Sequence, residues 1–243
     1  MSDYPTELLT FHGWGFSSDI WQSWESYLPP DLRVQHAERG YFGEGGVPQF
    51  EEEGSHKVIL THSFGLHWCP RPLIEQADHL VIISGFLSFH PERELAERRS
   101  RLLFQQMMSR FVEKPHEVLA QFYRNTYSPS ESPAAPYGEI NGESAGEIRG
   151  GISHDRLLED LGQLGTVRMG PEELHRIPAL TLIHGEEDAI VSNRKGRGIY
   201  RLLNRRSRYL EVKHAGHAVP FTHPEICCKF LNPVLQHQAV GDL

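Results

Sequence analysis

The chain has few cysteines, a deficit of positive charge and no long hydrophobic run. Its 243 residues include only three cysteines, Cys69, Cys227 and Cys228, whose spacing fits neither a zinc site nor a disulfide scaffold. We therefore expect reduced thiols that pack as small apolar side chains. Lysine and arginine number 24 against 32 aspartates and glutamates, and the resulting net charge of −8 disfavours a general role in nucleic-acid binding.

The apolar runs are also too short for a membrane helix, which needs about 18 consecutive apolar residues. The N-terminus begins with polar residues and leads directly into a predicted strand, so we expect no signal peptide, no membrane span and a cytoplasmic location. Fifteen histidines are scattered along the chain without an H-E-x-x-H arrangement. We therefore expect neither a bound metal ion nor a cofactor.

Short apolar runs recur towards both ends of the chain. Each is four to six residues long and most are rich in leucine, isoleucine and valine, which is typical of parallel strands covered on both faces. Helical stretches at 20–27 and 191–203 alternate with these runs, and this alternation predicts a wound α/β sheet. The predicted strands are residues 8–11, 32–36, 57–61, 79–84, 179–184 and 208–212.

Residues 86–170 interrupt this alternation. Helical composition over 92–112, 115–127 and 155–164 surrounds a stretch, 128–151, that is rich in serine, proline and glycine and predicts a long surface loop. An insertion at this point would cover the carboxyl ends of the strands, where open α/β sheets bind ligands. We expect residues 1–85 and 171–243 to form the core and residues 86–170 to form a helical lid.

The most informative segment is the apolar run that ends in Thr61-His62-Ser63-Phe64-Gly65. A serine between a buried strand and a helix lies on a sharp turn that exposes its hydroxyl, so Ser63 is the predicted nucleophile. The N–H of Phe64 would lie at the helix N-terminus, where it can stabilise an oxyanion. Because Thr61 stands where the G-x-S-x-G pattern has glycine, an ordinary strand-end serine remains the alternative.

Two later strands are followed by a candidate acid and a candidate base. Asp188 follows the strand 179–184 after a short glycine-containing turn, and two small residues lie before His217 in the loop after strand 208–212. A base that removes a serine proton works best when a third group orients it, and serine hydrolases use the chain order Ser-Asp-His. A turn or helix-capping role for Asp188 is the alternative. The competing candidates are Glu186 and Glu187 for the acid and His214 for the base.

A glycine-rich loop, His12-Gly13-Trp14-Gly15, follows the first predicted strand. Its glycines allow the backbone to turn sharply and to present an N–H group. The N–H groups of Trp14 and Phe64 would then form an oxyanion hole, in which each donor is worth about 10²–10³ in rate. The indole of Trp14 would line the acyl pocket. The alternative is a glycine-rich turn with a packed tryptophan.

These motifs resemble the α/β-hydrolase superfamily and, within it, the pimeloyl-[acyl-carrier protein] methyl ester esterases of biotin synthesis. The loops at 12–15, 61–65, 184–188 and 215–218 match superfamily motifs, whereas Trp14 and the segments 104–106 and 161–167 are similar to features of the esterase family. The resemblance implies an α/β-hydrolase fold: a mostly parallel sheet of about six strands with a helical lid inserted before the acid-bearing strand.

The resemblance also implies a serine carboxylesterase that hydrolyses the methyl ester of a pimeloyl chain carried by acyl-carrier protein. Ser63 would form the acyl-enzyme, His217 would shuttle the proton and Asp188 would orient His217. Phe122 falls near a lid position of the family that faces the acyl chain. The alternatives are a general esterase or thioesterase and, on the same fold, a non-catalytic ligand receptor.

Two groups of basic residues could bind the acidic surface of such a carrier. The lid group is interspersed with acidic residues and also fits an ordinary solvated helix face. The second is the run 194–208, which has seven lysines or arginines and no acid. The lid group is Arg93, Arg98, Arg99, Arg101, Arg110, Lys114 and Arg124.

Two features depart from the family pattern. Only about 14 residues separate Gly43 from the strand that carries the nucleophile, so we expect at most a short crossover helix there. Pro70 and Pro72 follow Ser63 closely, and a proline inside a helix costs about 3 kcal/mol or more. The helix after the nucleophile should therefore be short or kinked.

Overall fold

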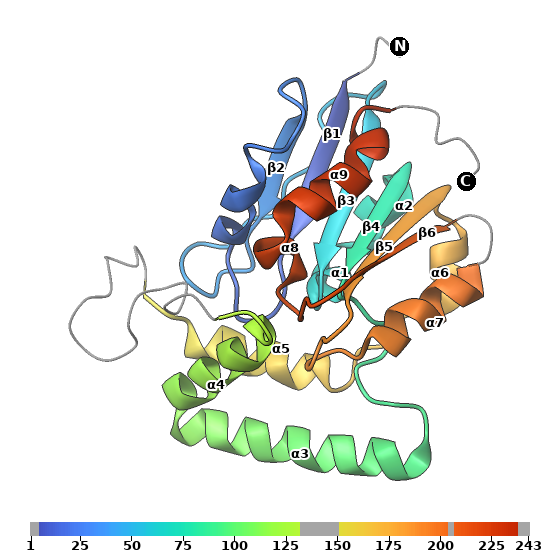
Figure 1. Ribbon diagram of the computed structural model, residues 1–243. Helices are drawn as coiled ribbons and strands as arrows, with labels where there is room; N and C mark the ends of the chain where they lie inside the picture. The colour runs from blue at the N-terminus through green and yellow to red at the C-terminus, as the bar shows by residue number, and fades with distance from the viewer. Residues whose placement is uncertain (1–4, 132–150, 204–206, 238–243) are drawn as a thin grey trace.

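The computed structural model describes residues 5–131, 151–203 and 207–237 of the chain. Within these residues, six parallel strands form one twisted sheet in the order β2-β1-β3-β4-β5-β6 (Figure 1). The predicted strands are confirmed, with shifts of one or two residues at their ends. Their bounds are β1 (Thr6–Phe11), β2 (Arg33–Ala37), β3 (His56–His62), β4 (His79–Ile83), β5 (Ala179–Gly185) and β6 (Ser207–Val212).

Burial across the sheet follows the hydrophobicity of the strands. Every residue of β1 and β4 is buried, as are the last five residues of β3, whereas the edge strands β2 and β6 are mostly partly exposed. Continuous apolar sequence therefore marks the central strands, as expected for a sheet covered on both faces. Since β3 lies between β1 and β4, its carboxyl end opens at the middle of the sheet edge.

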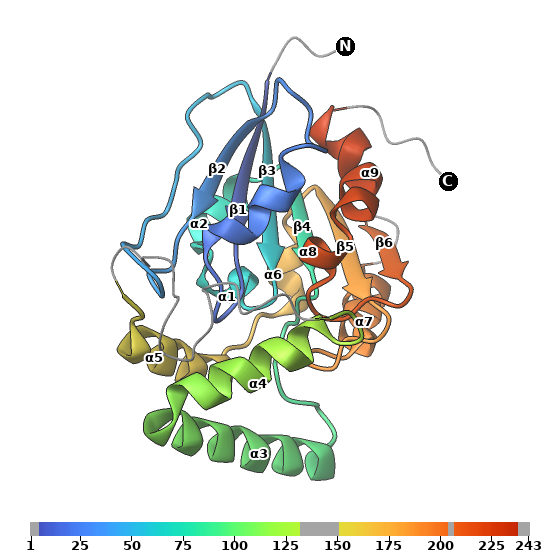
Figure 2. The ribbon, with the colours of Figure 1, turned by 60° about the vertical axis from the view of Figure 1, so that its left-hand side comes forward.

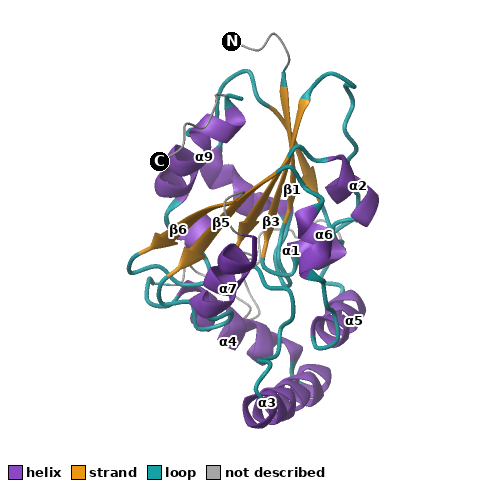
Figure 3. Ribbon diagram, turned by 90° about the vertical axis from the view of Figure 1, so that its right-hand side faces the viewer, coloured by secondary structure: helices purple, strands orange, loops and turns teal. Residues whose placement is uncertain are grey.

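Helices cover both faces of this sheet (Figures 2 and 3). A 3-10 helix, η1, packs with α8 and α9 on one face, and the indole N–H of Trp24 in η1 donates to the carbonyl of Pro220 in α8 at 2.6 Å. The opposite face carries α1, α2, α6 and α7. Their bounds are η1 (Ser18–Trp24), α1 (Gly65–Trp68), α2 (Arg71–Gln76), α6 (Pro171–His175), α7 (Asn193–Leu203), α8 (Val219–Thr222) and α9 (Pro224–Leu235).

Three further helices lie at the carboxyl ends of the strands, and we call α3 (Glu94–Glu113), α4 (Pro115–Tyr127) and α5 (His154–Leu164) the cap helices (Figure 1). Helix α4 lies between the core and α3. Only Phe104 and Phe111 are buried in α3, so this outer helix is held by a narrow apolar contact. Most of the surface loop predicted at 128–151 lies outside the described residues.

Both expected departures in the core are present. Residues 38–55, all of which are described, contain no helix between β2 and β3. The helix after Ser63 stops at Trp68, and Pro70 and Pro72 begin a separate helix, α2. The three cysteines are free and buried, and burial raises the pKa of the Cys228 thiol to about 12. Among the described helices, none combines the length and apolar character needed to cross a membrane.

Candidate active site

The turn after β3 holds Ser63 in a backbone conformation that few non-glycine residues adopt. Its φ angle is 54°, and its N–H donates to the carbonyl of Ile83 at 2.9 Å, which ties the turn to β4. Gly65 is required because a Cβ at that position would overlap the carbonyl oxygen of Phe11. Thr61, which stands in place of the pattern's glycine, is fully buried, and its hydroxyl donates to the carbonyl of Val81 at 3.2 Å.

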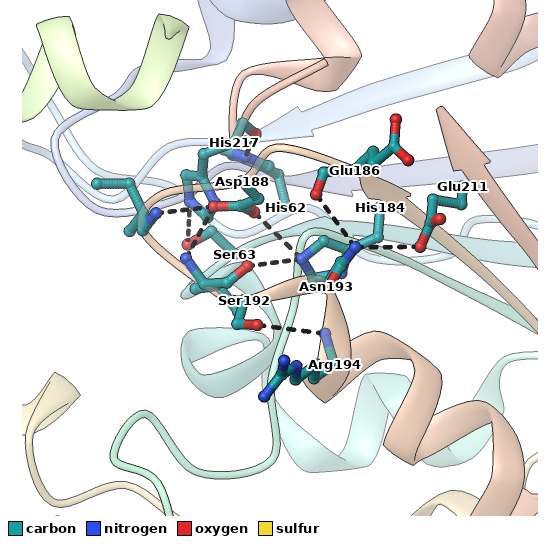
Figure 4. Close-up of polar contacts among 12 residues, drawn as sticks. His62, Ser63, His184, Glu186, Asp188, Ser192, Asn193, Arg194, Glu211 and His217 are labelled. Carbon is teal, nitrogen blue, oxygen red and sulfur yellow. Dashed lines mark hydrogen bonds and ion pairs between the residues drawn. The ribbon is translucent and has the colours of Figure 1, made fainter. Parts of the chain in front are cut away.

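Three side chains from separate strand ends form one hydrogen-bonded chain (Figure 4). His217 Nδ1 lies 2.8 Å from Asp188 Oδ2, and His217 Nε2 lies 2.9 Å from Ser63 Oγ. Because a carboxylate only accepts, Nδ1 carries the proton, and in the neutral imidazole Nε2 then accepts from the serine hydroxyl. The arrangement can therefore move the proton of Ser63 onto His217 while Asp188 holds the ring.

Asp188 is held as a carboxylate by four contacts. Its Oδ1 accepts from the N–H groups of Ile190 and Val191 at 2.9 and 2.8 Å, and its Oδ2 contacts His217 and, at 3.1 Å, His184 Nε2. Burial raises the pKa of this carboxyl, but the two histidines lower it more, so the pKa lies well below its usual range. Because the N–H groups of Ile190 and Val191 bind Oδ1 in a turn, α7 begins at Asn193 rather than at the predicted residue 191.

Two histidines that the sequence motifs did not single out support this chain of contacts. His62 Nε2 donates to the backbone carbonyl of His217 at 3.1 Å, and His184 Nε2 donates to the carbonyl of Val191 at 2.8 Å. Burial, with a smaller contribution from His217, lowers the pKa of His62 well below its usual value, so the ring stays neutral at pH 7. Their positions beside Ser63 and before Asp188 were the only signal in the sequence.

The competing candidates for the acid and the base lie away from Ser63. The side chain of His214 is 86% exposed and pairs with Glu187 at 3.2 Å, and Glu186 is exposed. The structure therefore places Asp188 and His217, rather than these neighbours, at the buried serine.

The His12–Gly15 loop packs directly against the Ser63 turn. A Cβ on Gly13 would lie 3.0 Å from the Cβ of Ser63, so glycine permits this approach. The loop carbonyls are occupied: that of His12 accepts from the indole of Trp68 at 2.8 Å, and that of Gly13 from His12 Nδ1 at 2.9 Å. Among the described residues, by contrast, the backbone N–H groups of Trp14 and Phe64 have no acceptor. Such unpaired N–H groups next to a nucleophile can bind an oxyanion.

The side chains of Trp14 and Phe122 pack against each other. Their ring centroids lie 4.9 Å apart, and the indole N–H of Trp14 donates to the carbonyl of Leu157 in α5 at 2.8 Å. Phe122 also lines a groove of about 460 Å³ between α3 and α4. The groove is lined by Leu103, Gln106, Met107, Arg110, Val118, Gln121, Phe122, Asn125 and Ile190.

Comparison with known proteins found similar solved structures but no match by sequence. No model of a known protein family and no curated protein matches the chain. A bromoperoxidase from Bacillus anthracis is 16% identical with a TM-score of 0.72, over 96% of this chain and 92% of that chain. An esterase (EaEST) from Exiguobacterium antarcticum is 12% identical with a TM-score of 0.71, over 96% and 92%. The enol-lactonase from Burkholderia xenovorans LB400 is 13% identical with a TM-score of 0.68, over 97% and 92%.

The structure and these similarities define the fold class. The parallel sheet, the helices on both faces and the match over nearly the whole chain show that this protein has the α/β-hydrolase fold, as predicted. At these identities the similarity concerns the fold alone. The activity has to be argued from the residues around Ser63.

Proposed function

We propose that this protein is a serine-dependent carboxylic ester hydrolase in which Ser63, His217 and Asp188 act as a catalytic triad. One observation carries the proposal: the continuous hydrogen-bonded chain from Ser63 Oγ through His217 to Asp188, with distances of 2.9 and 2.8 Å. The unpaired N–H groups of Trp14 and Phe64 support it, since they supply the oxyanion donors that acyl transfer requires.

In the first half of the reaction, Ser63 Oγ attacks the ester carbonyl carbon and its proton passes to His217 Nε2. The carbonyl oxygen becomes an oxyanion, which accepts hydrogen bonds from the N–H groups of Trp14 and Phe64. Collapse of the tetrahedral intermediate breaks the bond to the alcohol, and His217 returns the proton to the departing oxygen. Asp188 stabilises the imidazolium, and its lowered pKa keeps it ionised throughout.

In the second half, water replaces the alcohol. His217 removes a proton from the water, whose oxygen attacks the acyl carbon bound to Ser63, and the same two N–H groups hold the second oxyanion. When this intermediate collapses, the proton on His217 passes to Ser63 Oγ and the carboxylic acid is released. The enzyme then returns to its starting state.

The groove between α3 and α4 indicates which kind of acyl group the substrate carries. Its volume of about 460 Å³ lies within the usual range for small-molecule sites. Leu103, Met107, Val118, Phe122 and Ile190 make it mostly apolar, and Ile190 also donates its N–H to Asp188. We propose that a medium-length acyl chain occupies this groove and that the cap helices serve as the lid of the active site.

The narrower proposal is the methyl ester of a pimeloyl chain on acyl-carrier protein. The apolar groove supports the chain length, while the carrier would need basic side chains free to bind it. Within the run 194–208, Arg197 pairs with Glu211 and Lys195 Nζ donates to the carbonyls of Ser88 and His90. Among the described residues of that run, Arg194 and Arg201 are the exposed basic side chains without an acidic partner, and they are the proposed contacts.

A fluorophosphonate probe tests the hydrolase proposal. Attack by Ser63 Oγ on phosphorus displaces fluoride and leaves a stable covalent adduct. We expect labelling of the wild type and none in Ser63→Ala. The matched control is Ser84→Ala, because Ser84 also ends a central strand with a positive φ of 49° and is buried, but its hydroxyl has no partner among the described residues. Failure of the folded wild type to label would contradict the proposal and favour a ligand receptor.

Two further measurements test the substrate. Expression of this chain in a biotin-requiring strain that lacks its own esterase should restore growth, and Ser63→Ala should not. Continued biotin requirement despite stable expression would contradict the pimeloyl proposal and leave the general esterase. Comparison of kcat/KM for matched oxygen esters and thioesters then decides between esterase and thioesterase.

A further inference from the structure

Helix α4 contacts both of the loops that would act on the reacting carbonyl. Near its middle, the hydroxyl of Tyr123 donates to the carbonyl of Gly15 at 2.6 Å, and a Cβ on Gly15 would lie 3.3 Å from the ring of Phe122. Gly15 directly follows Trp14, whose N–H is the proposed oxyanion donor. The left-handed φ of Gly15, 74°, is one that glycine adopts without strain, so the loop relies on outside contacts for its conformation.

The carboxyl end of the same helix contacts the loop that carries His217. The N–H of Ala218 donates to the carbonyl of Thr126 at 2.9 Å. One residue before His217, a Cβ on Gly216 would overlap the carbonyl oxygen of Ser128. The backbone on both sides of His217 is therefore held in place. Thr126 of α4 binds Ala218, and Ser128, which follows α4, packs against Gly216.

The two hydrogen bonds among these contacts are buried. Tyr123 is 2% exposed, and Thr126 and His217 are fully buried, so water does not replace a hydrogen bond that is lost here. The Ser63 turn differs, because its N–H is bound by Ile83 at the end of β4 and its glycine packs against β1. Helix α4 is thus the common support of the oxyanion loop and the base loop, and the sheet is the support of the nucleophile.

We infer that the Tyr123 hydroxyl and the backbone carbonyls of Thr126 and Ser128 are positioning groups, which together fix the Trp14 N–H and the His217 imidazole in place. The inference rests on the proposed function. An oxyanion donor must lie about 2.7–3.1 Å from the developing charge, so a small displacement of the Gly15 carbonyl weakens catalysis. Displacement of α4 would disturb both loops at once, which links the position of the cap helices to the rate of the chemical step.

The first test compares Tyr123→Phe with Tyr127→Phe in the full chain. Both tyrosines are buried on α4, but among the described residues the Tyr127 hydroxyl has no hydrogen-bond partner. With p-nitrophenyl butyrate, we expect Tyr123→Phe to lower kcat about tenfold with KM within about twofold, because one buried hydrogen bond to the oxyanion loop is lost. Tyr127→Phe should match the wild type.

A trifluoromethyl ketone separates positioning from general loosening of the fold. Ser63 Oγ adds to the ketone carbon, its proton passes to His217, and the ketone oxygen becomes an oxyanion in the Trp14–Phe64 site. Tyr123→Phe should therefore weaken inhibition by the same factor as it lowers kcat, about tenfold. A purely structural effect would lower the thermal midpoint without this parallel change.

The second test adds a methyl group at the other contact. Gly216→Ala should lower kcat about 100-fold by displacing the His217 loop, whereas Gly198→Ala, whose Cβ would lie in open space on α7, should not. If Gly216→Ala does not fold, the tyrosine pair decides. Equal kcat and equal ketone inhibition in the two tyrosine variants would overturn the inference while the hydrolase proposal stands. A wild type that fluorophosphonate does not label would overturn both.

Discussion

The nucleophile and the base of the proposed triad are held in place by different parts of the molecule. Ser63 lies on a turn whose N–H is bound at the end of β4 and whose glycine packs against β1. His217 lies on a loop whose backbone is bound by His62 and by the carbonyl of Thr126 in α4. The nucleophile therefore depends on the sheet, whereas the base depends both on β3, through His62, and on a helix of the cap.

This difference determines which of the loops around the active site the cap helices can influence. Movement of the cap helices would leave the Ser63 turn unchanged but would alter the His217 loop and, through Gly15, the oxyanion loop. The contrast predicts that changes in the cap lower the rate of the reaction without removing the nucleophile, as the following substitutions test.

The largest effect should follow the loss of the carboxylate that orients His217. We expect Asp188→Asn to lower kcat about 10⁴-fold, because the imidazole is no longer held in the productive tautomer. Steady-state kinetics measure this loss, and circular dichroism should show a folded protein. Retention of kcat within tenfold would show that the loop backbone alone orients the base.

The same carboxylate should make the protein sensitive to acid. Since the pKa of Asp188 is lower in the folded protein than the value of about 3.9 for an unfolded chain, its contribution to stability is complete above about pH 4 and is lost as the pH falls further. Urea unfolding of the wild type and of Asp188→Asn between pH 3 and pH 6 should give curves that converge towards acid pH. Parallel curves would show that Asp188 is not the source of the acid sensitivity.

The next effect concerns the attachment of the cap to the core. Asp160 of α5 is fully buried. Its carboxylate accepts two hydrogen bonds of 2.6 Å from Arg39 and one of 2.7 Å from the hydroxyl of Tyr41. We expect Asp160→Ala to lower the free energy of unfolding by about 3–5 kcal/mol, because Arg39 loses its partner. Urea unfolding measures the change, and Asp155→Ala, exposed on the same helix, should cost less than about 1 kcal/mol.

A smaller effect tests the groove on the inner side of α3. We expect Leu103→Trp to lower kcat/KM for p-nitrophenyl octanoate about tenfold while the acetate ester is hydrolysed as before, because the larger ring fills the space for the chain. The control is Leu95→Trp, which lies on the same helix at a position 83% exposed and outside the groove. Equal losses with both esters would place the acyl chain elsewhere.

The smallest effect is expected on the outer side of α3. Arg98 and Glu94 pair at 2.5 Å, but their side chains are 74% and 77% exposed. Solvent screens such a pair, so Arg98→Ala should change the free energy of unfolding by no more than about 0.5 kcal/mol and leave kcat unchanged. A larger loss of activity would show that this outer surface takes part in function.

The strands and the position of Ser63 could be predicted because their causes are local. Continuous apolar runs have few alternatives to a buried strand, and the serine turn follows from the small residue at Gly65. Pro70 and Pro72 predicted the broken helix after the serine for an equally local reason. Helix ends were less predictable where a side chain binds the turn before the helix, as Asp188 does before α7.

The supports of the site could not be predicted, because their partners are far apart in the sequence. Tyr123 and Gly15 are separated by 108 residues, and Tyr41 and Asp160 by 119. A tyrosine on an amphipathic helix has no local sign of the carbonyl that it will bind. The role of His62 was likewise hidden, since only the folded chain brings the backbone of His217 within 3.1 Å of its ring.

By itself, then, the amino-acid sequence determined the order of the strands along the chain, the class of fold and which side chains reach the carboxyl edge of the sheet. Hydrophobic periodicity and turn chemistry act over a few residues, so they can be read without the fold. The tertiary structure alone decided that α4 would hold two of the three loops around Ser63. That choice depends on hydrogen bonds and close contacts between segments that meet only after the core has packed.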